Sequence, residues 1–374
     1  MDYSRESTET KKSSIPQSGG SMNANKVVLL LATLVFTCFA SVAFSQLAVD
    51  PLLAKLNALP PEERQAALVK GAQTERVVEW YATLPVEHSK VLIEAFRQRY
   101  PFIEVNYTGA GGGRMVNRVV TEHRAGLNKF DVLGGTSTSH VALMKAGVIA
   151  RNVTPVRKEL RDGFMDAEGY RVAPFTYALV IGYNTRALSK EQRARSYEEL
   201  LEPKWKNQIG LEAAGYEWLG AMIDTMGEER ALAFARKLAT QNLRVQQGSS
   251  LLVQQMIAGE FNVLIDALHY QLENLKERGA PVDYVIPDPL LIKDPSGIWL
   301  AKYSPHPHAA ALLVDFLFTR DAQEIYARQN RLVARKDMEW RFREKLPSRI
   351  HVISVDKWAP RYNELIGLFD KTFR

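Results

Sequence analysis

The sequence predicts an α/β protein of two lobes, each a mainly parallel sheet flanked by helices, with a ligand cleft between the lobes. Two observations carry this prediction. Strand-like and helix-like segments alternate with short connections in residues 76–149 and again in residues 208–279. Two long extended stretches, 170–188 and 282–302, are rich in proline or glycine and flank the second set. We therefore expect one lobe to be inserted into the other, with two crossings that form a hinge around the cleft.

In the first set, helices that end at a proline or a glycine follow the strands. The helix after the first strand stops at Pro101, and the helix after a glycine-rich turn stops at Gly126. Two short helices precede this set, and Pro60-Pro61 opens the second of them. The expected helices lie within 52–75 and at 88–100, 114–126 and 137–149, and the expected strands at 76–83, 102–108 and 130–135.

The second set repeats this order. Its expected strands are 208–214, 243–247 and 262–268. One expected helix begins at residue 217, and two more span 250–260 and 270–279. After the second extended stretch we expect helices to the end of the chain, with 308–329 as the clearest amphipathic segment. The expected organisation is an N-terminal helical extension at 46–75, lobe 1 at 76–175 and 296–374, lobe 2 at 186–283, and crossings at 176–185 and 284–295.

The first 45 residues are expected to lie outside the fold. Residues 1–21 are polar, whereas residues 22–46 combine a lysine, an apolar run and small residues, as in a secretory signal peptide cleaved before Gln46. Met22 is then a natural start of translation. This pattern predicts a periplasmic protein, and an uncleaved membrane anchor is the alternative.

Composition sets further limits. The chain has 374 residues, 46% hydrophobic and 24% charged, which suits a soluble protein of two domains. Its net charge of +6 has no basic block, so nucleic-acid binding has no compositional support. The single cysteine, Cys38, lies inside the apolar run after Phe36-Thr37, which disfavours lipid attachment. The exported chain therefore holds no thiolate nucleophile or thiolate metal site.

The glycine-rich turn "NYTGAGGGRMVNRVV", residues 106–120, joins a strand to a helix. It matches neither G-x-G-x-x-G nor the Walker loop, because Arg114 stands where a required glycine would be. A helix N-terminus with a nearby guanidinium suits an anionic or strongly polar ligand, and a tight turn with a surface arginine is the alternative. The loops 83–88, 109–114 and 135–139 all follow strands and are expected at one sheet edge, where ligands bind.

Several longer segments carry a resemblance to a known family. They are "VVEWYATLP", "LIEAFRQRYPFIEV", "FDVL", "LVIGYNTRAL", "EPKWKNQIGL", "MIAGEFNVLIDALHYQLENLKERGAPVDYV" and "SPHPHAAALLVDFLFTRDAQEI". In order and spacing, residues 71–335 resemble the periplasmic solute-binding proteins of ABC importers, in the type II group that contains ferric-iron binders. The resemblance implies a monomer without catalysis or an obligatory cofactor, which captures a solute and docks on a permease of the inner membrane.

The ferric members of this group typically hold the metal with two adjacent tyrosines, and His269-Tyr270 stands at that place here. The resemblance therefore implies Fe³⁺, or a ferric complex, as transported ligand with a changed ligand set. Phenolate oxygen suits Fe³⁺ because the hard cation lowers the phenol pKa. The candidate metal ligands are Tyr270, His269, Tyr216, Glu87 and His88, and Glu217 is a further one.

A small organic or phosphorylated anion is the alternative solute. Backbone amides, a guanidinium and hydroxyls would then bind it, since helix N-termini favour negative charge. The candidate ligand-binding residues for either solute are Gly111, Gly112, Gly113, Arg114, Thr136, Ser137, Tyr216, Glu217 and Tyr270, with hydroxyls as far as Ser139.

Two remaining patterns favour structural roles. His306-Pro307-His308 precedes a long apolar helix, where proline is common in the first turn, so we expect a helix start rather than a metal site. The acidic residues at 283, 288 and 294 are expected in turns. A remote alternative is a periplasmic metal-assisted hydrolase that uses Glu217, His269 and Glu260, but no catalytic spacing supports it.

Overall fold

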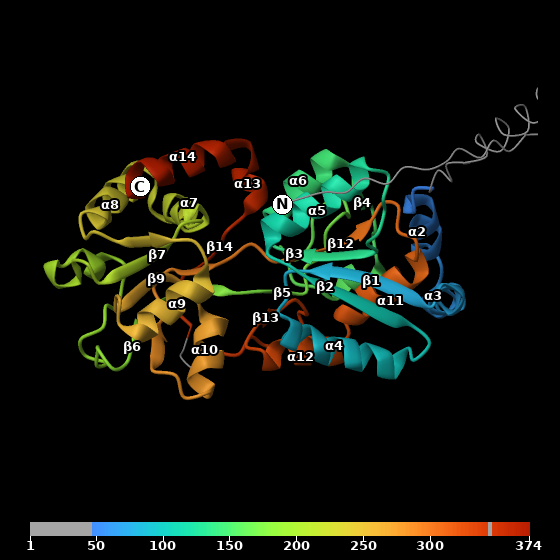
Figure 1. The fold of residues 1–374 in the computed structure, drawn as a ribbon, viewed down its shortest axis with the longest axis horizontal. Helices are drawn as coiled ribbons and strands as arrows, with labels where there is room; N and C mark the ends of the chain where they lie inside the picture. The colour runs from blue at the N-terminus through green and yellow to red at the C-terminus, as the bar shows by residue number, and fades with distance from the viewer. Residues whose placement is uncertain (1–46, 343–345) are drawn as a thin grey trace, which may run out of the picture. The chain divides into compact units, whose positions relative to one another are not determined.

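The computed structural model describes residues 47–342 and 346–374. The expected signal peptide and Cys38 lie outside these residues. Within them, no helix combines the length and the apolar character that a membrane crossing requires. The described chain contains two large sheets with helices on both faces of each (Figure 1), as the sequence predicts.

The first sheet has five strands in the order β2-β1-β3-β12-β4. Strand β1 pairs in parallel with β2 and β3, whereas β12 is antiparallel to β3 and β4 because it enters from the second lobe. The strands are β1 (Val77–Ala82), β2 (Glu104–Gly109), β3 (Val132–Gly135), β4 (Ile149–Ala150) and β12 (Gly297–Ala301).

Successive side chains of a strand point to opposite faces of the sheet, and both faces of this sheet are buried under helices. Val78, Trp80 and Ala82 of β1 belong to the core under α3, α4 and α11, while Tyr81 belongs to the core under α5 and α6. The helices of this lobe are α2 (Asp50–Asn57), α3 (Pro61–Glu75), α4 (Val86–Arg99), α5 (Gly112–Arg124), α6 (Ser139–Ala146), α11 (Pro307–Leu317) and α12 (Arg320–Arg328).

The second sheet has seven strands, with a main order of β14-β11-β6-β9-β7-β8 and β10 paired to β6. Strands β7, β8 and β9 are parallel, and β6 is antiparallel to β9. The strands are β6 (Ala178–Asn184), β7 (Ile209–Glu212), β8 (Arg244–Gln246), β9 (Val263–Leu268), β10 (Val282–Val285), β11 (Leu290–Ile292) and β14 (Ile350–Val352).

Helices cover both faces of the second sheet as well. Leu179 and Ile181 of β6 pack in the core under α7, α8 and α14, and Ala178 and Val180 pack in the core under α9 and α10. The helices are α7 (Tyr216–Met226), α8 (Glu228–Ala239), α9 (Ser249–Ala258), α10 (His269–Glu277), α13 (Val355–Trp358) and α14 (Tyr362–Phe373). Short 3₁₀ turns lie at η1 (Pro155–Glu159), η2 (Glu198–Leu201), η3 (Pro203–Trp205) and η4 (Ala359–Arg361).

The two crossings are shorter than the sequence predicts. Most of 176–185 is the buried strand β6, and 284–295 contains β11, because their apolar residues continue the second sheet. The remaining crossing segments hydrogen-bond to each other. Lys293 N donates to Tyr177 O over 2.9 Å, and Ser296 N donates to Phe175 O over 3.1 Å. A small pair of strands, β5 (Phe175–Thr176) and β13 (Leu332–Val333), lies beside them.

A buried ion pair fixes the second crossing. Arg171 Nη1 lies 2.7 Å from Asp294 Oδ1, and their side chains are 4% and 5% exposed. The expectation of a turn residue at position 294 is therefore wrong, since the carboxylate neutralises a buried guanidinium. Asp283 is not a turn residue either, because it lies on strand β10 and forms an ion pair with Lys276.

The C-terminal segment corrects the predicted lobe boundary. Residues 296–374 were expected in lobe 1 and as helices only, but β14 pairs with β11 of the second sheet. Helix α14 then buries Leu365 and Phe369 against the second lobe, where Gly220 of α7 lets Leu365 and Trp358 approach closely. The amphipathic pattern of α14 predicts a buried face but does not say which lobe covers it.

The start of α11 is a helix start, as predicted. Pro307 is its first residue. Glu75, at the end of α3, accepts hydrogen bonds from the His308 and Ala309 backbone N–H groups and lies 2.6 Å from His308 Nδ1. His306 Nδ1 lies 2.9 Å from the buried Asp131 carboxylate. Both histidines therefore anchor the helix to neighbouring segments of lobe 1.

We predict that Arg171→Met lowers the free energy of unfolding by about 3–5 kcal/mol, because it removes the guanidinium that neutralises the buried Asp294 carboxylate. Urea unfolding measures this difference. The matched control is Arg328→Met, since Arg328 forms an exposed ion pair with Glu324 and should change stability by less than about 1 kcal/mol. Equal effects of the two substitutions would contradict the prediction.

Candidate functional site

A polar cavity of about 320 Å³ lies between the two sheets. The first lobe contributes the start of α5 and the loop after β3, and the second lobe contributes the ends of β7 and β9 and the starts of α7 and α9. Its lining residues are Gly112, Thr136, Thr138, Tyr177, Leu179, Glu212, Ala214, Gly215, Tyr216, Glu217, Trp218, Ser249, Asp266, Leu268 and Lys293. We call this space the cleft cavity.

Four helices begin at the cleft cavity, namely α5, α6, α7 and α9. The first N–H groups of a helix have no partner within the helix and attract negative charge. Glu212 already occupies this position at α9, because both of its carboxylate oxygens accept from Gly248 N at 2.9 and 3.0 Å. No described side chain caps α5 or α7, so these two helix starts, one from each lobe, remain available to a ligand.

The charged groups of the cleft cavity are a closely spaced set. Lys293 Nζ lies 2.8 Å from Glu217 Oε2. Burial by itself lowers the pKa of Lys293, but the charge and hydrogen bond of Glu217 raise it above its ordinary value, so the pair is ionised. Burial raises the pKa of Asp266 to about 7, although the hydrogen bond from Glu212 N to Asp266 Oδ1 opposes this rise.

A second cavity, of about 270 Å³, lies between α4 of the first lobe and α9 and α10 of the second. Glu87, His88 and Tyr270 line it together. Arg331 Nη2 lies 3.1 Å from His88 Nδ1. Burial, together with the Arg331 charge, lowers the pKa of His88 to about 4, so the imidazole is neutral and can accept this hydrogen bond.

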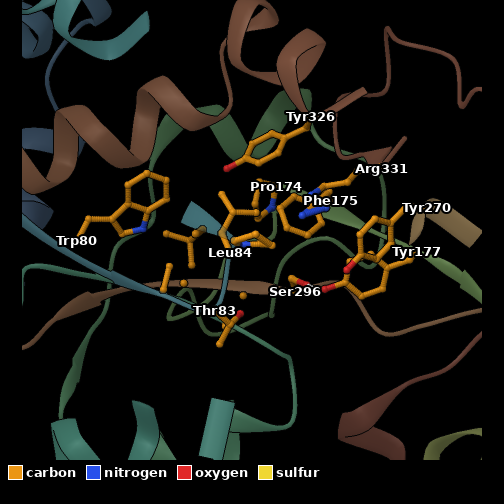
Figure 2. A pocket seen from close by; sticks show the side chains of 16 residues that line it. Trp80, Thr83, Leu84, Pro174, Phe175, Tyr177, Tyr270, Ser296, Tyr326 and Arg331 are labelled. Atoms are coloured by element: carbon orange, nitrogen blue, oxygen red, sulfur yellow. Dashed lines mark hydrogen bonds between the residues drawn. The ribbon is translucent and has the colours of Figure 1, made fainter. Parts of the chain in front are cut away.

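Tyr270 lies in an aromatic and cationic environment (Figure 2). Its ring centroid is 5.1 Å from that of Tyr177, and the Arg331 guanidinium carbon is 4.7 Å from the Tyr270 centroid. The Tyr177 hydroxyl lies 2.8 Å from Ser296 Oγ. Burial raises the pKa of Tyr270, Tyr177 adds to this rise, and Arg331 opposes it. Two phenols from different elements thus lie side by side at the cleft.

The structure brings together only part of the predicted ligand-binding set. Gly112, Thr136, Tyr216 and Glu217 line the cleft cavity, and Tyr270 lines the second cavity. In contrast, Gly111, Gly113 and Arg114 are exposed, and Ser137 is buried behind the loop.

The candidate metal ligands divide in the same way. Glu87, His88 and Tyr270 share the second cavity, whereas Tyr216 is packed edge-on against Tyr362 at the cleft cavity. His269 does not join them. Its ring is 1% exposed and stacks on Phe342 with centroids 4.9 Å apart, because consecutive helical residues point in different directions. The described residues contain no group of three or more His, Cys, Asp or Glu side chains that could hold a metal ion.

The hydrolase alternative fails on geometry. Glu217 is paired with Lys293 in the cleft cavity, and His269 is buried in the core under α9 and α10. Glu260 is exposed and lies 3.6 Å from Arg244. The three residues that this alternative needs therefore do not form one site.

Sequence reasoning missed the residues that the crossings and loop ends bring to the site. They are Tyr177, Glu212, Asp266, Lys293 and Arg331. Asp266 and Glu212 lie near the ends of predicted strands. Their place in the sequence could therefore have predicted that they lie at the ligand-binding edge of a sheet. Lys293 and Tyr177 lie in extended stretches, where the sequence does not indicate which side chains face a cleft.

A comparison with protein families decides the class of this protein. The family described as "Bacterial extracellular solute-binding protein" matches residues 130–361. The chain belongs to this family. Membership confirms the resemblance to solute-binding proteins and the expectation of a binding protein rather than an enzyme.

Curated relatives of this solute-binding protein include two with iron in their names. It is 26% identical over 169 residues to "Iron uptake protein A1" of Synechocystis sp., a match that spans 41% of this chain and 46% of the relative. It is 21% identical over 238 residues to "Fe(3+)-binding periplasmic protein" of Serratia marcescens, over 61% of this chain and 70% of the relative. The chain thus spans less than half of the Synechocystis protein's length.

Solved structures confirm the two-lobed fold. Iron-bound HitA from Pseudomonas aeruginosa aligns with a TM-score of 0.66 and 18% identity, over 79% of this chain and 99% of that one. AfuA from Actinobacillus pleuropneumoniae, in a structure with fructose-6-phosphate bound, aligns with a TM-score of 0.66 and 19% identity, over 79% of this chain and 98% of that one. At these identities the likeness concerns the fold alone.

We predict that Asp266→Asn flattens the pH dependence of stability. The pKa of Asp266 rises from 3.8 to about 7 on folding. Its contribution to the free energy of unfolding is therefore complete below about pH 4 and is lost as pH rises toward 7, by at most about 1.4 kcal/mol per unit. Urea unfolding from pH 4 to 8 measures this loss, and exposed Asp162→Asn is the control. Parallel curves for wild type and Asp266→Asn would contradict the prediction.

Proposed function

We propose that this solute-binding protein is the periplasmic receptor of an ABC importer. As a monomer, it captures a solute between its lobes and delivers the solute unchanged to a permease in the inner membrane. Three observations support this role: the family, the two sheets joined by two short crossings, and cavities lined by both lobes. The crossings provide a hinge, since a few residues at the ends of elements can absorb the rotation of a lobe.

The proposed solute is ferric iron in complex with an anion. The observation that carries this proposal is the second cavity, where Glu87 and His88 of the first lobe face Tyr270 of the second. Phenolate, carboxylate and imidazole are all suitable ligands for iron. The names of the Synechocystis and Serratia relatives support iron as the metal.

The surroundings of Tyr270 favour a ferric complex over a bare ion. Arg331 stacks on Tyr270 and hydrogen-bonds His88, so a cation is already present beside the two side chains. A bare trivalent cation at this place would be repelled. An anion that accompanies the metal removes this repulsion, and the uncapped starts of α5 and α7 suit further negative charge.

A metal-free anion is the second candidate solute, and the four helix starts at the cleft cavity favour it. Such a solute would carry a phosphate or carboxylate group bound by backbone N–H groups of α5 and α7. AfuA, which shares the fold, has fructose-6-phosphate in its structure. The two candidates differ in whether the phenol of Tyr270 loses its proton on binding.

We predict that ferric citrate gives the purified protein a visible phenolate-to-iron absorption band and that Tyr270→Phe abolishes it. Each phenol that binds the metal releases one proton, since burial keeps the pKa of Tyr270 above its ordinary value. The apparent affinity should therefore rise by about tenfold per pH unit for each phenol between pH 6.5 and 8. Titrations that follow the band at several pH values measure this slope.

Tyr303→Phe is the matched control, because Tyr303 lies outside the lining of both cavities and stacks on His123. It should retain the band. A protein that stays colourless with ferric citrate excludes iron as the solute. If phosphorylated solutes then raise the melting temperature without colour, the metal-free candidate is supported.

A further inference from the structure

Helix α14 supports a segment of the cleft cavity without lining the cavity itself. The segment is residues 213–217, between β7 and the first turn of α7, and we call it the α7 entry segment. Ala214, Gly215, Tyr216 and Glu217 of this segment line the cleft cavity, whereas none of the described residues of α14 does. Three side chains on or next to α14 nevertheless contact the segment, so its position depends on a helix outside the cavity.

The first contact joins two aromatic rings at the starts of two helices. Tyr362, the first residue of α14, lies edge-on against Tyr216, the first residue of α7. Their ring centroids are 5.3 Å apart, and the angle between the ring planes is 79°. An edge-to-face pair is a favourable arrangement of two rings, so it selects one ring orientation. Tyr362 therefore restricts the rotamers that the Tyr216 phenol adopts at the cleft cavity.

The second contact requires the glycine of the α7 entry segment. A methyl group at Gly215 would lie 3.1 Å from Phe369 Cε2 and 2.8 Å from Glu212 O, so a larger residue does not fit. Phe369 of α14 is 0% exposed and belongs to the core of the second lobe. Because protein cores are closely packed, the Phe369 ring fixes how far the backbone at Gly215 can move away from the cavity.

The third contact is a hydrogen bond to the backbone of the α7 entry segment. Arg374, which follows α14, donates from Nη2 to Ala213 O over 2.8 Å. Its Nη1 lies 3.1 Å from Asp370 Oδ1, so a carboxylate of α14 orients the guanidinium. Ala213 N in turn donates to Gln246 O at the end of β8 over 2.8 Å. The segment is therefore held from the sheet on one side and from α14 on the other.

We propose that Tyr362, Phe369 and Arg374 are positioning residues for the solute. They hold the α7 entry segment in the conformation in which its side chains and the first N–H groups of α7 face the cleft. This inference rests on the proposed function and deepens it, because it assigns part of the binding geometry to a helix outside both cavities. Without these contacts the segment adopts several conformations, and the cost of ordering it lowers the affinity for the solute.

Hydrogen exchange measured by mass spectrometry tests this support in the absence of any solute. In Tyr362→Leu and in Arg374→Gln, the backbone amides of residues 213–217 should exchange about 2- to 10-fold faster than in wild type, since each variant loses a contact that stabilises the segment locally. Leu365→Ala is the matched control, because Leu365 packs near Gly220 in the middle of α7. It should lower the stability of the lobe without faster exchange of the segment. Wild-type exchange of the segment in Tyr362→Leu and Arg374→Gln would overturn the inference.

Titration with ferric citrate then measures the effect on solute binding. Tyr362→Leu and Arg374→Gln should bind about 10-fold more weakly than wild type, as when a residue that orients a ligating side chain is removed. Leu365→Ala should keep the wild-type affinity, which a purely structural role of α14 does not predict. Wild-type affinity in Tyr362→Leu and Arg374→Gln, despite faster exchange of the segment, would also overturn the inference.

Arg361→Gln is a second control for the loss of an arginine. Arg361 directly precedes α14 and forms exposed ion pairs with Glu228 and Glu364. This variant should match wild type in both measurements. Failure of the iron proposal looks different, since ferric citrate would then give no absorption band with wild type. The exchange rates of residues 213–217 alone would then decide whether α14 positions the segment.

Discussion

The site depends on the hydrogen bonds between the two crossings. Lys293 N donates to Tyr177 O, and Ser296 N donates to Phe175 O, so the two segments pass between the lobes side by side. The buried Arg171–Asp294 pair fixes the second segment to the first lobe. Because the segments are paired, side chains 116 positions apart in the sequence, Tyr177 and Lys293, meet at the same cleft cavity.

This constraint also places the helix starts. Helices α5, α6, α7 and α9, which follow β2, β3, β7 and β8, begin at the cleft cavity. Loops at strand ends can differ without disturbing the cores, since the cores lie between strands and helices. A solute-binding protein of this design can therefore change its solute through a few loop and crossing residues.

The two buried cations of the site differ in their partners. Lys293 is neutralised by Glu217, whereas Arg331 contacts His88, Phe175 and Tyr270 and forms no ion pair with a carboxylate of the described residues. The lysine pair can be satisfied before any solute arrives, but the arginine cannot.

The sequence by itself determined the alternation of strands and helices, the helix start at Pro307 and the family. Hydrophobic periodicity and capping residues act locally, so these features need no knowledge of distant contacts. The position of a loop directly after a strand predicted Thr136 at a sheet edge, and Thr136 lines the cleft cavity. The sequence also predicted helices toward the end of the chain, and α14 is one of them.

Only the tertiary structure determined which segments each buried face packs against. His269 and Tyr270 are adjacent, yet one is buried in a core and the other lies at the cleft, because successive helical residues point about 100° apart. Helix α14 packs on the second lobe at Gly220, and Arg331 contacts His88 and two aromatic rings that lie far from it in the sequence. Periodicity reports that a residue is buried, but partners and charges around it depend on segments far away in the chain.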